Sequence, residues 1–151
     1  MNGTPSSGGR GTVAFPVPAE AAFDYHVEPR NRPAWQSSLA GVEDVDGQPR
    51  AGQRWTDVTR PGLRPAMETT ELDRPHRWSE RGTWHGFSAR LTLAFHPRQD
   101  RCEVAFEFAV DGRGALAPVG VVLTRLAVPA VRADLRRAAR ILGDAGRAWR
   151  P

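Results

Sequence analysis

The chain has 151 residues, of which 40% are hydrophobic and 25% are charged, and these ordinary globular proportions exclude wholesale disorder. The length fits one domain and argues against an enzyme with separate cofactor and substrate domains. The formal net charge is +4, and all 21 basic residues are arginines.

The beginning of the chain is poor in apolar side chains. Residues 1–10 are mostly Gly, Ser, Pro and Asn, so we expect them to form a disordered tail. They hold no apolar run of the kind found in a secretory signal, and no hydrophobic stretch in the sequence approaches the ~20 residues that cross a bilayer. We therefore expect a soluble, cytoplasmic protein. The single cysteine, Cys102, agrees with a buried thiol in a reducing compartment.

One short strand and two short helices are predicted next. The β-favouring run 12–15 predicts the first strand. Pro18 suits the first turn of a helix that ends before Pro29. A second short helix is predicted within 31–36, with Trp35 projecting from its end.

From residue 39 onward the sequence predicts a series of hairpins. Turn signals such as Asp46-Gly47 and Pro61-Gly62 separate runs in which apolar and polar residues alternate. Six strands are expected, near 40–46, 53–60, 67–72, 77–85, 91–95 and 102–110. Alternation of this kind is typical of an antiparallel sheet with one face in solvent and the other covered.

A long helix near 115–142 is the predicted cover for this sheet, and Pro129 is expected to bend or interrupt it. The result is an α+β domain over residues 11–142, with a C-terminal tail at 143–151. Because a twisted sheet curls, the helix meets it well at one end and leaves a gap elsewhere, in which a ligand could bind.

The sequence PAEAAFDY at 18–25, continued by EPRNRPAW at 28–35, resembles the opening of the START/Bet v1-like (SRPBCC) superfamily. Within it, the polyketide cyclase/dehydrase and lipid-transport group is the most similar, and the likeness covers 11–142. It implies a helix-grip fold, in which a curved antiparallel sheet of about seven strands wraps on a long C-terminal helix, with two short helices between the first and second strands. It also implies a cavity for an apolar ligand. No motif of one enzymatic branch matches, so no catalytic residue is carried over.

Apolar side chains on the inward face are the candidates for ligand binding, because ligand cavities are mainly apolar and aromatic with a few polar groups. Each of the apolar candidates also fits a plain core position. The candidates are Trp35, Trp55, Met67, Trp78, Glu80, Trp84, Leu91, Leu93, Phe106, Phe108, Leu123 and Val131.

Two carboxylates are weak catalytic candidates. Glu80 shares strand parity with Trp78 and Trp84, so it faces inward unless the strand end is wet or a bulge at Gly82 reverses the parity. An inward carboxylate needs a partner or a raised pKa, and could bind a ligand hydroxyl or transfer protons. Asp134 lies within the apolar arc of the last helix, where a capping or solvent-facing role competes with a pocket role.

Other site classes are excluded by spacing. The chain has no Gly-rich phosphate loop, dinucleotide fingerprint or nucleophile elbow. Its four histidines include no close pair on a helical face, so we expect no metal and no cofactor. Arg54 and Arg90 are expected to point to solvent.

The positive charge is concentrated near the C-terminus. Residues 125–151 hold seven arginines against two aspartates, a balance of +5, whereas the other 124 residues hold 14 arginines against 15 acidic residues. Helical geometry places five of the arginines within about an 80° arc: Arg125, Arg132, Arg136, Arg140 and Arg147. We interpret this arginine stripe first as a solvated face. Docking on an acidic partner or membrane is the alternative, and nucleic acid is not expected because no aromatic residues are interleaved.

Three functional hypotheses follow. The leading one is a carrier or sensor that encloses a hydrophobic lipid, aromatic or polyketide-like molecule between the sheet and the last helix. The alternative is an enzyme of the polyketide cyclase/dehydrase kind, in which Glu80 with a partner moves protons. The third is a docking protein that uses the arginine stripe. The sequence predicts no oligomeric state.

Overall fold

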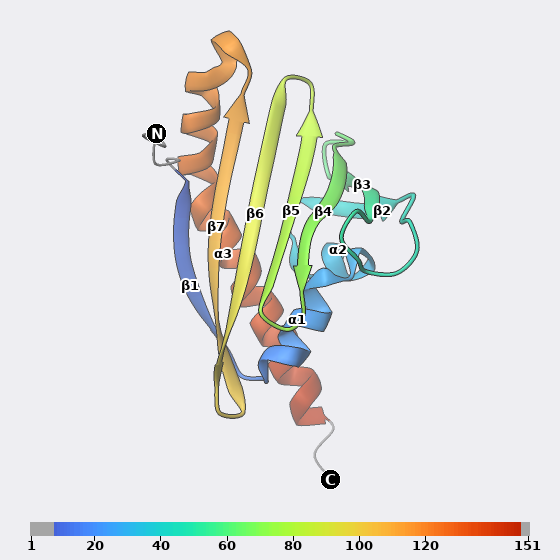
Figure 1. The fold of residues 1–151 in the computed structure, drawn as a ribbon, viewed down its shortest axis with the longest axis vertical. Helices are drawn as coiled ribbons and strands as arrows, with labels where there is room; N and C mark the ends of the chain where they lie inside the picture. Colours follow the sequence, from blue (N-terminus) through green and yellow to red (C-terminus); the bar gives the residue numbers. More distant parts are fainter. Residues whose placement is uncertain (1–7, 149–151) are drawn as a thin grey trace.

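Seven antiparallel strands form one curved sheet in the order β1-β7-β6-β5-β4-β3-β2 (Figure 1). The computed structural model describes residues 8–148. The strands are β1 (Gly9–Phe15), β2 (Leu39–Glu43), β3 (Arg54–Thr59), β4 (Ala66–Asp73), β5 (Arg77–Trp84), β6 (Phe87–Arg98) and β7 (Arg101–Gly112). All six strand pairs are antiparallel, as the hairpin series predicts.

The helices lie where the sequence places them. Between β1 and β2 are α1 (Ala19–Val27), the 3-10 turn η1 (Pro29–Asn31) and α2 (Arg32–Trp35), and after β7 come η2 (Gly114–Leu116) and α3 (Ala117–Ala148). Helix α3 runs across one face of the sheet, behind β7 and β6 in Figure 1. The predicted α+β helix-grip fold is confirmed.

The core lies between this covered face and the helices. In β6, Leu91, Leu93 and Phe95 are buried while the intervening residues are more exposed, which is the period-two pattern of a sheet covered on one side. Helix α3 closes the core with Leu135 and Ala138, both fully buried.

Strand β1 begins earlier than predicted. It starts at Gly9, which pairs with Phe108 of β7, so the expected tail boundary at residue 10 is wrong for Gly9 and Arg10; residues 1–7 lie outside the described residues. Gly9 and Arg10 have no apolar side chain to bury, and their backbone pairing with Phe108 and Glu107 of β7 keeps them in the sheet. A Cβ at Gly9 would overlap Val128 of α3, so glycine lets the helix approach the strand.

Helix α3 also extends further than predicted. It continues to Ala148 and contains Pro129, so the tail predicted at 143–151 is helical up to 148, and residues 149–151 lie outside the described residues. Pro129 removes only the hydrogen bond to the carbonyl of Arg125, and Arg125 is exposed, where water can replace that bond. Gly143 continues the helix against Pro16, whose Cγ would lie 2.9 Å from a Cβ at that position.

The first half of α3 is unusually apolar for an uncovered helix. The helical segment Gly114–Arg147 is long and apolar enough to cross a membrane by length and composition alone, with an 18-residue window of mean hydropathy 1.7 of which 11% is buried. The expectation of no such stretch is therefore wrong, because Arg125 interrupts the run without removing its apolar character.

Candidate ligand-binding cleft

A cleft of about 260 Å³ opens on the concave face of the sheet. Its walls come from β3, β4, β5, β6 and β7 and from the segment of α2 and β2. The lining residues are Arg32, Gln36, Ser38, Leu39, Asp57, Thr59, Pro65, Met67, Glu80, Gly82, Thr83, Trp84, Phe87, Ala89 and Phe108. None of the described α3 residues lines it, so the expected hollow between sheet and long helix lies instead between the sheet and the α2–β2 segment.

Two larger hollows share some lining residues with this cleft and have a different character. One of about 360 Å³ is lined largely by charged and hydroxyl side chains, including Arg10, Arg90 and Glu107. Another of about 540 Å³ surrounds the β5–β6 turn. The concave cleft is smaller, but it combines apolar walls with buried polar groups, which is the composition of a small-molecule site.

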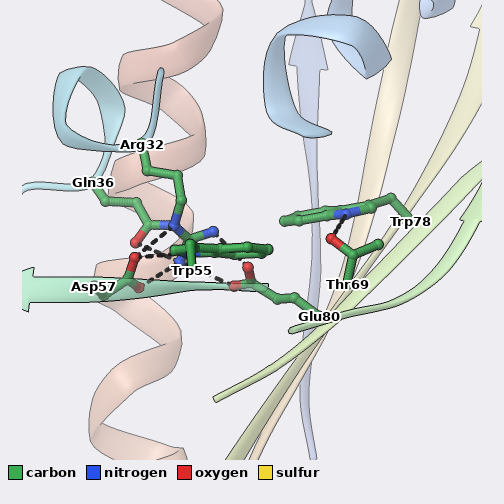
Figure 2. Close-up of polar contacts among 7 residues, drawn as sticks. All are labelled: Arg32, Gln36, Trp55, Asp57, Thr69, Trp78 and Glu80. Carbon is green, nitrogen blue, oxygen red and sulfur yellow. Dashed lines mark hydrogen bonds and ion pairs between the residues drawn. The ribbon is translucent and has the colours of Figure 1, made fainter. Parts of the chain in front are cut away.

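A buried ion cluster forms the polar part of the cleft (Figure 2). The Arg32 guanidinium of α2 donates from Nε and Nη2 to the two carboxylate oxygens of Asp57 on β3, at 3.0 and 2.8 Å. The same guanidinium donates from Nη1 to Oε2 of Glu80 on β5 at 2.5 Å. All three residues are at most 6% exposed. Such a fork of parallel bonds fixes both carboxylates in place.

Two further side chains complete the cluster. Trp55 Nε1 donates to Asp57 Oδ1 at 2.9 Å, and the Arg32 guanidinium lies 5.2 Å from the centre of the Trp55 ring, in the range of a cation–π contact. Arg32 Nη2 also donates to Gln36 Oε1 at 3.3 Å. The guanidinium is therefore satisfied from several directions, as a buried charge requires.

The cluster carries an unbalanced charge. One guanidinium faces two carboxylates, so the fully ionised cluster has a formal charge of −1. Burial raises the pKa of Glu80 and outweighs the opposing effect of Arg32. Burial also disfavours the charge on Arg32, but Glu80 and Asp57 overcome this effect and raise the guanidinium pKa above its ordinary value. Burial thus shifts Glu80 toward its protonated form.

Four of the twelve predicted binding residues line this cleft: Met67, Glu80, Trp84 and Phe108. Glu80 faces inward as its parity with Trp78 indicates, because the register shift in this region falls in β4 between Thr69 and Glu71 rather than at Gly82. Trp84 is 39% exposed, because it is the last residue of β5 and lies at the rim of the cleft.

The other predicted binding residues lie outside the cleft. Most fill the core, where they are at most 6% exposed: Trp35, Trp55, Trp78, Leu91, Leu93 and Phe106. Val131 is half-buried against that core. Leu123 is 40% exposed. The first half of α3 contacts β7 through Gly120 and Thr124, and Leu123 lies to one side of this contact.

Asp134 has a structural contact instead of a place in the cleft. Its Oδ1 accepts hydrogen bonds from the backbone N and the hydroxyl of Ser37, at 3.2 and 3.0 Å. Burial raises its pKa, against the effect of these bonds. The contact ties α3 to the segment after α2.

The remaining predictions concern one thiol and two arginines. Cys102 is buried, and burial raises its thiol pKa to about 11. Arg54 and Arg90 are exposed, as predicted.

Arg32 and Asp57 were not predicted as site residues. A signal for Asp57 was available, because it shares the strand parity of Trp55 and must face inward with it. The inward carboxylate of Glu80 likewise implied a buried cation. Nothing in the spacing selected Arg32, which lies 25 residues from Asp57 and 48 from Glu80.

A family model described as polyketide cyclase / dehydrase and lipid transport matches residues 10–145. The chain belongs to this family. The predicted START/Bet v1-like resemblance is thereby confirmed, and the match spans every strand except Gly9 at the start of β1. No curated protein matches this family member by sequence.

Solved structures share the fold at low sequence identity. Protein MLL2253 from Mesorhizobium loti has a TM-score of 0.70 at 15% identity, over 89% of this chain and 97% of that one. The di-domain ARO/CYC BexL from the BE-7585A biosynthetic pathway has a TM-score of 0.71 at 16% identity, over 88% of this chain and 45% of BexL. Ara h 8.0201 has a TM-score of 0.71 at 11% identity, over 91% and 97%. These likenesses show the fold of the family member alone.

Proposed function

We propose that this protein binds a hydrophobic small molecule in the concave cleft, as a carrier or sensor. The observation that carries the proposal is the combination of an apolar hollow of about 260 Å³ with the Arg32–Asp57–Glu80 cluster in its wall. A dry cavity of ~150 Å³ accommodates benzene, so the cleft suits about two fused rings or an equivalent chain. Membership of a family described by polyketide and lipid chemistry supports this class of ligand.

The cluster also indicates which polar group the ligand carries. The Nε, Nη1 and Nη2 donors of Arg32 already point at Asp57, Glu80 and Gln36. What the cleft offers is therefore carboxylate oxygen with an excess negative charge. A ligand hydroxyl can donate to it, whereas a ligand carboxylate is repelled.

Two aromatic probes that share the naphthalene ring and differ in their polar group test this proposal. We expect 2-naphthol to bind the protein and 2-naphthoate to bind at least about tenfold more weakly, a difference of about 1.4 kcal/mol, as measured by isothermal titration calorimetry. Ala89→Phe fills the cleft and is expected to abolish 2-naphthol binding. Ala94→Phe places the same ring on the opposite face of β6 and is expected to leave binding unchanged. Equal loss in both variants, or equal affinity for both probes, contradicts the proposal.

A cyclase/dehydrase activity is the second candidate, because Glu80 lines the cleft and has a raised pKa. A raised pKa favours the protonated carboxyl, which is the form that acts as a general acid. We expect Glu80→Gln to change 2-naphthol affinity by less than about tenfold. With a reactive polyketide chain as substrate, an enzyme would lose turnover in Glu80→Gln while still binding that chain. A carrier shows no turnover in either form.

Cytoplasmic localisation stays a prediction.

A further inference from the structure

The end of η2 and the start of α3 expose a continuous apolar surface, which we call the apolar end of α3: Leu116 of η2 and Val119, Val122, Leu123 and Leu126 of α3. Leu126 is 70% exposed and Val122 is 55% exposed. Isolated exposed apolar residues are ordinary, but a contiguous group of large ones marks a site of contact with something other than water.

These side chains are not misplaced core residues. The opposite side of the same turns is fixed to β7, where Val110 N donates to the Thr124 hydroxyl at 2.8 Å and that hydroxyl donates to the Gly120 carbonyl at 2.9 Å. A Cβ at Gly120 would lie 2.7 Å from the Val110 carbonyl, so this face is already in tight contact. Val122 and Leu126 therefore point away from the sheet.

Two members of the arginine stripe, Arg136 and Arg140, continue the same outward face toward the C-terminus, whereas Arg132 lies over the Phe106 ring and donates to the Thr12 carbonyl. At about 100° per residue, Val122 and Leu126 share their helix side with Arg136 and Arg140. Within the described residues, neither of these two arginines, nor Arg125, forms an ion pair. Exposed arginines elsewhere are commonly paired, as Arg74 is with Asp24 and Arg81 with Glu68. The outward face of α3 is thus apolar at its start and carries the unpaired charges of Arg136 and Arg140 further along, before Arg147, which pairs with Asp144.

We propose that the outward face of α3 docks on an anionic lipid bilayer. The apolar end enters the boundary between headgroups and acyl chains, and Arg136 and Arg140 lie against lipid phosphates. Shallow insertion of apolar side chains together with attraction of basic ones is the physical basis of peripheral membrane binding. Because Leu135 and Ala138 of the same helix are fully buried in the core, α3 lies on the membrane and does not cross it.

A bilayer explains both halves of this face, whereas a second copy of the chain does not. Pairing two apolar ends would bring Arg125 of both copies close together. It would also leave Arg136 and Arg140 without a counter-charge. Anionic lipid supplies an apolar interior and a negative surface at once, and so complements the whole length of the helix.

The docking face adjoins the mouth of the cleft. The β5–β6 turn and the start of α3 lie at the same end of the molecule (Figure 1), where Arg113 N donates to the Gly86 carbonyl at 2.9 Å. Trp84, at the cleft mouth, is part of this end. A docked protein would hold its cleft beside the bilayer, although the docking itself does not depend on the proposed ligand function.

Co-sedimentation of the full chain with vesicles tests the proposal. We expect binding to phosphatidylcholine vesicles that contain about 30% phosphatidylglycerol and little binding to pure phosphatidylcholine, because only the former carries a negative surface potential. Arg136→Gln with Arg140→Gln should weaken partitioning about 30-fold. Val122→Ser with Leu126→Ser should weaken it roughly 100-fold. All four residues are exposed, so these variants are expected to fold.

Matched control variants distinguish docking through α3 from a general effect of net charge or surface hydrophobicity. Arg54→Gln with Arg98→Gln removes the same charge far from the apolar end, and Leu63→Ser removes an apolar side chain that is 43% exposed on the β3–β4 loop; both should bind vesicles like the unmodified chain. Equal losses in test and control variants overturn the proposal. So does a Leu126-dependent dimer in sedimentation velocity together with no vesicle binding. Loss of 2-naphthol binding in Ala89→Phe with vesicle binding intact leaves docking supported.

Discussion

Replacing Arg32 by methionine is expected to lower the free energy of unfolding by about 3–5 kcal/mol at neutral pH. The substitution leaves Asp57 and Glu80 buried and facing each other without the guanidinium that bonds both of them. Methionine fills a similar volume, so the loss reports the uncompensated charge more than a cavity. Urea unfolding followed by circular dichroism measures the change.

The pH dependence distinguishes this cause from simple loss of packing. As the pH falls, the unpaired carboxylates of Arg32→Met take up protons, so its deficit relative to the unmodified protein should shrink. The triple change Arg32→Met, Asp57→Asn and Glu80→Gln should recover part of the stability. Arg54→Met alters an exposed arginine and should change stability by no more than about 0.5 kcal/mol. A deficit that stays constant with pH would refute the charge explanation.

His26 should make the protein acid-sensitive by about 3 kcal/mol between pH 6.5 and 4. Complete burial is the main reason that the pKa of His26 is lowered from 6.5 to about 4, with Arg32 adding to the shift and the bond to the Ala22 carbonyl opposing it. The ring is therefore neutral in the folded protein. Unfolding exposes it to water, where it binds a proton below pH 6.5, so the unfolded state gains protons and stability falls with pH until it levels off below 4.

The geometry around the ring explains why no proton is accepted. The His26 Nδ1–H donates to the Ala22 carbonyl at 2.7 Å. Nε2 is buried with no hydrogen-bond partner among residues 8–148, and the ring lies against those of Phe15, Trp35 and Phe95. In His26→Phe this part of the pH dependence should vanish, as measured by urea unfolding at a series of pH values. His96→Phe changes an exposed ring and should preserve it. An unchanged decline in His26→Phe would show that other groups cause the acid sensitivity.

The residues of the cleft differ in how far the sequence alone could predict their positions. Strand alternation was enough to turn Glu80 inward, since period two is a property of each strand by itself. The same alternation places Asp57 on the face of Trp55. Once two carboxylates share a covered face, a buried cation becomes necessary. Which arginine supplies that cation depends on how the short helix α2, distant in sequence, packs against the sheet.

The positions along α3 show the same division. Helical spacing correctly placed Arg136 and Arg140 on the exposed side and Leu135 and Ala138 on the buried side, but it did not indicate that Arg132 lies over Phe106 and donates to the Thr12 carbonyl. It could not tell that Leu123 would be exposed, because exposure depends on where the helix meets the sheet. That meeting is decided by close contacts between residues far apart in sequence, such as Gly9 with Val128 and Gly120 with Val110.

The amino-acid sequence alone determined the order of strands and helices, the covered face of the sheet and the family resemblance, because turn residues and periodicity are local properties of the chain. Only the tertiary structure decided that Arg32 neutralises the inward carboxylates, that the hollow opens beside α2 rather than under α3, and that the start of α3 remains bare. These features arise from pairing and packing between distant segments. Residue spacing along the chain does not indicate which faces of the helices and the sheet come into contact.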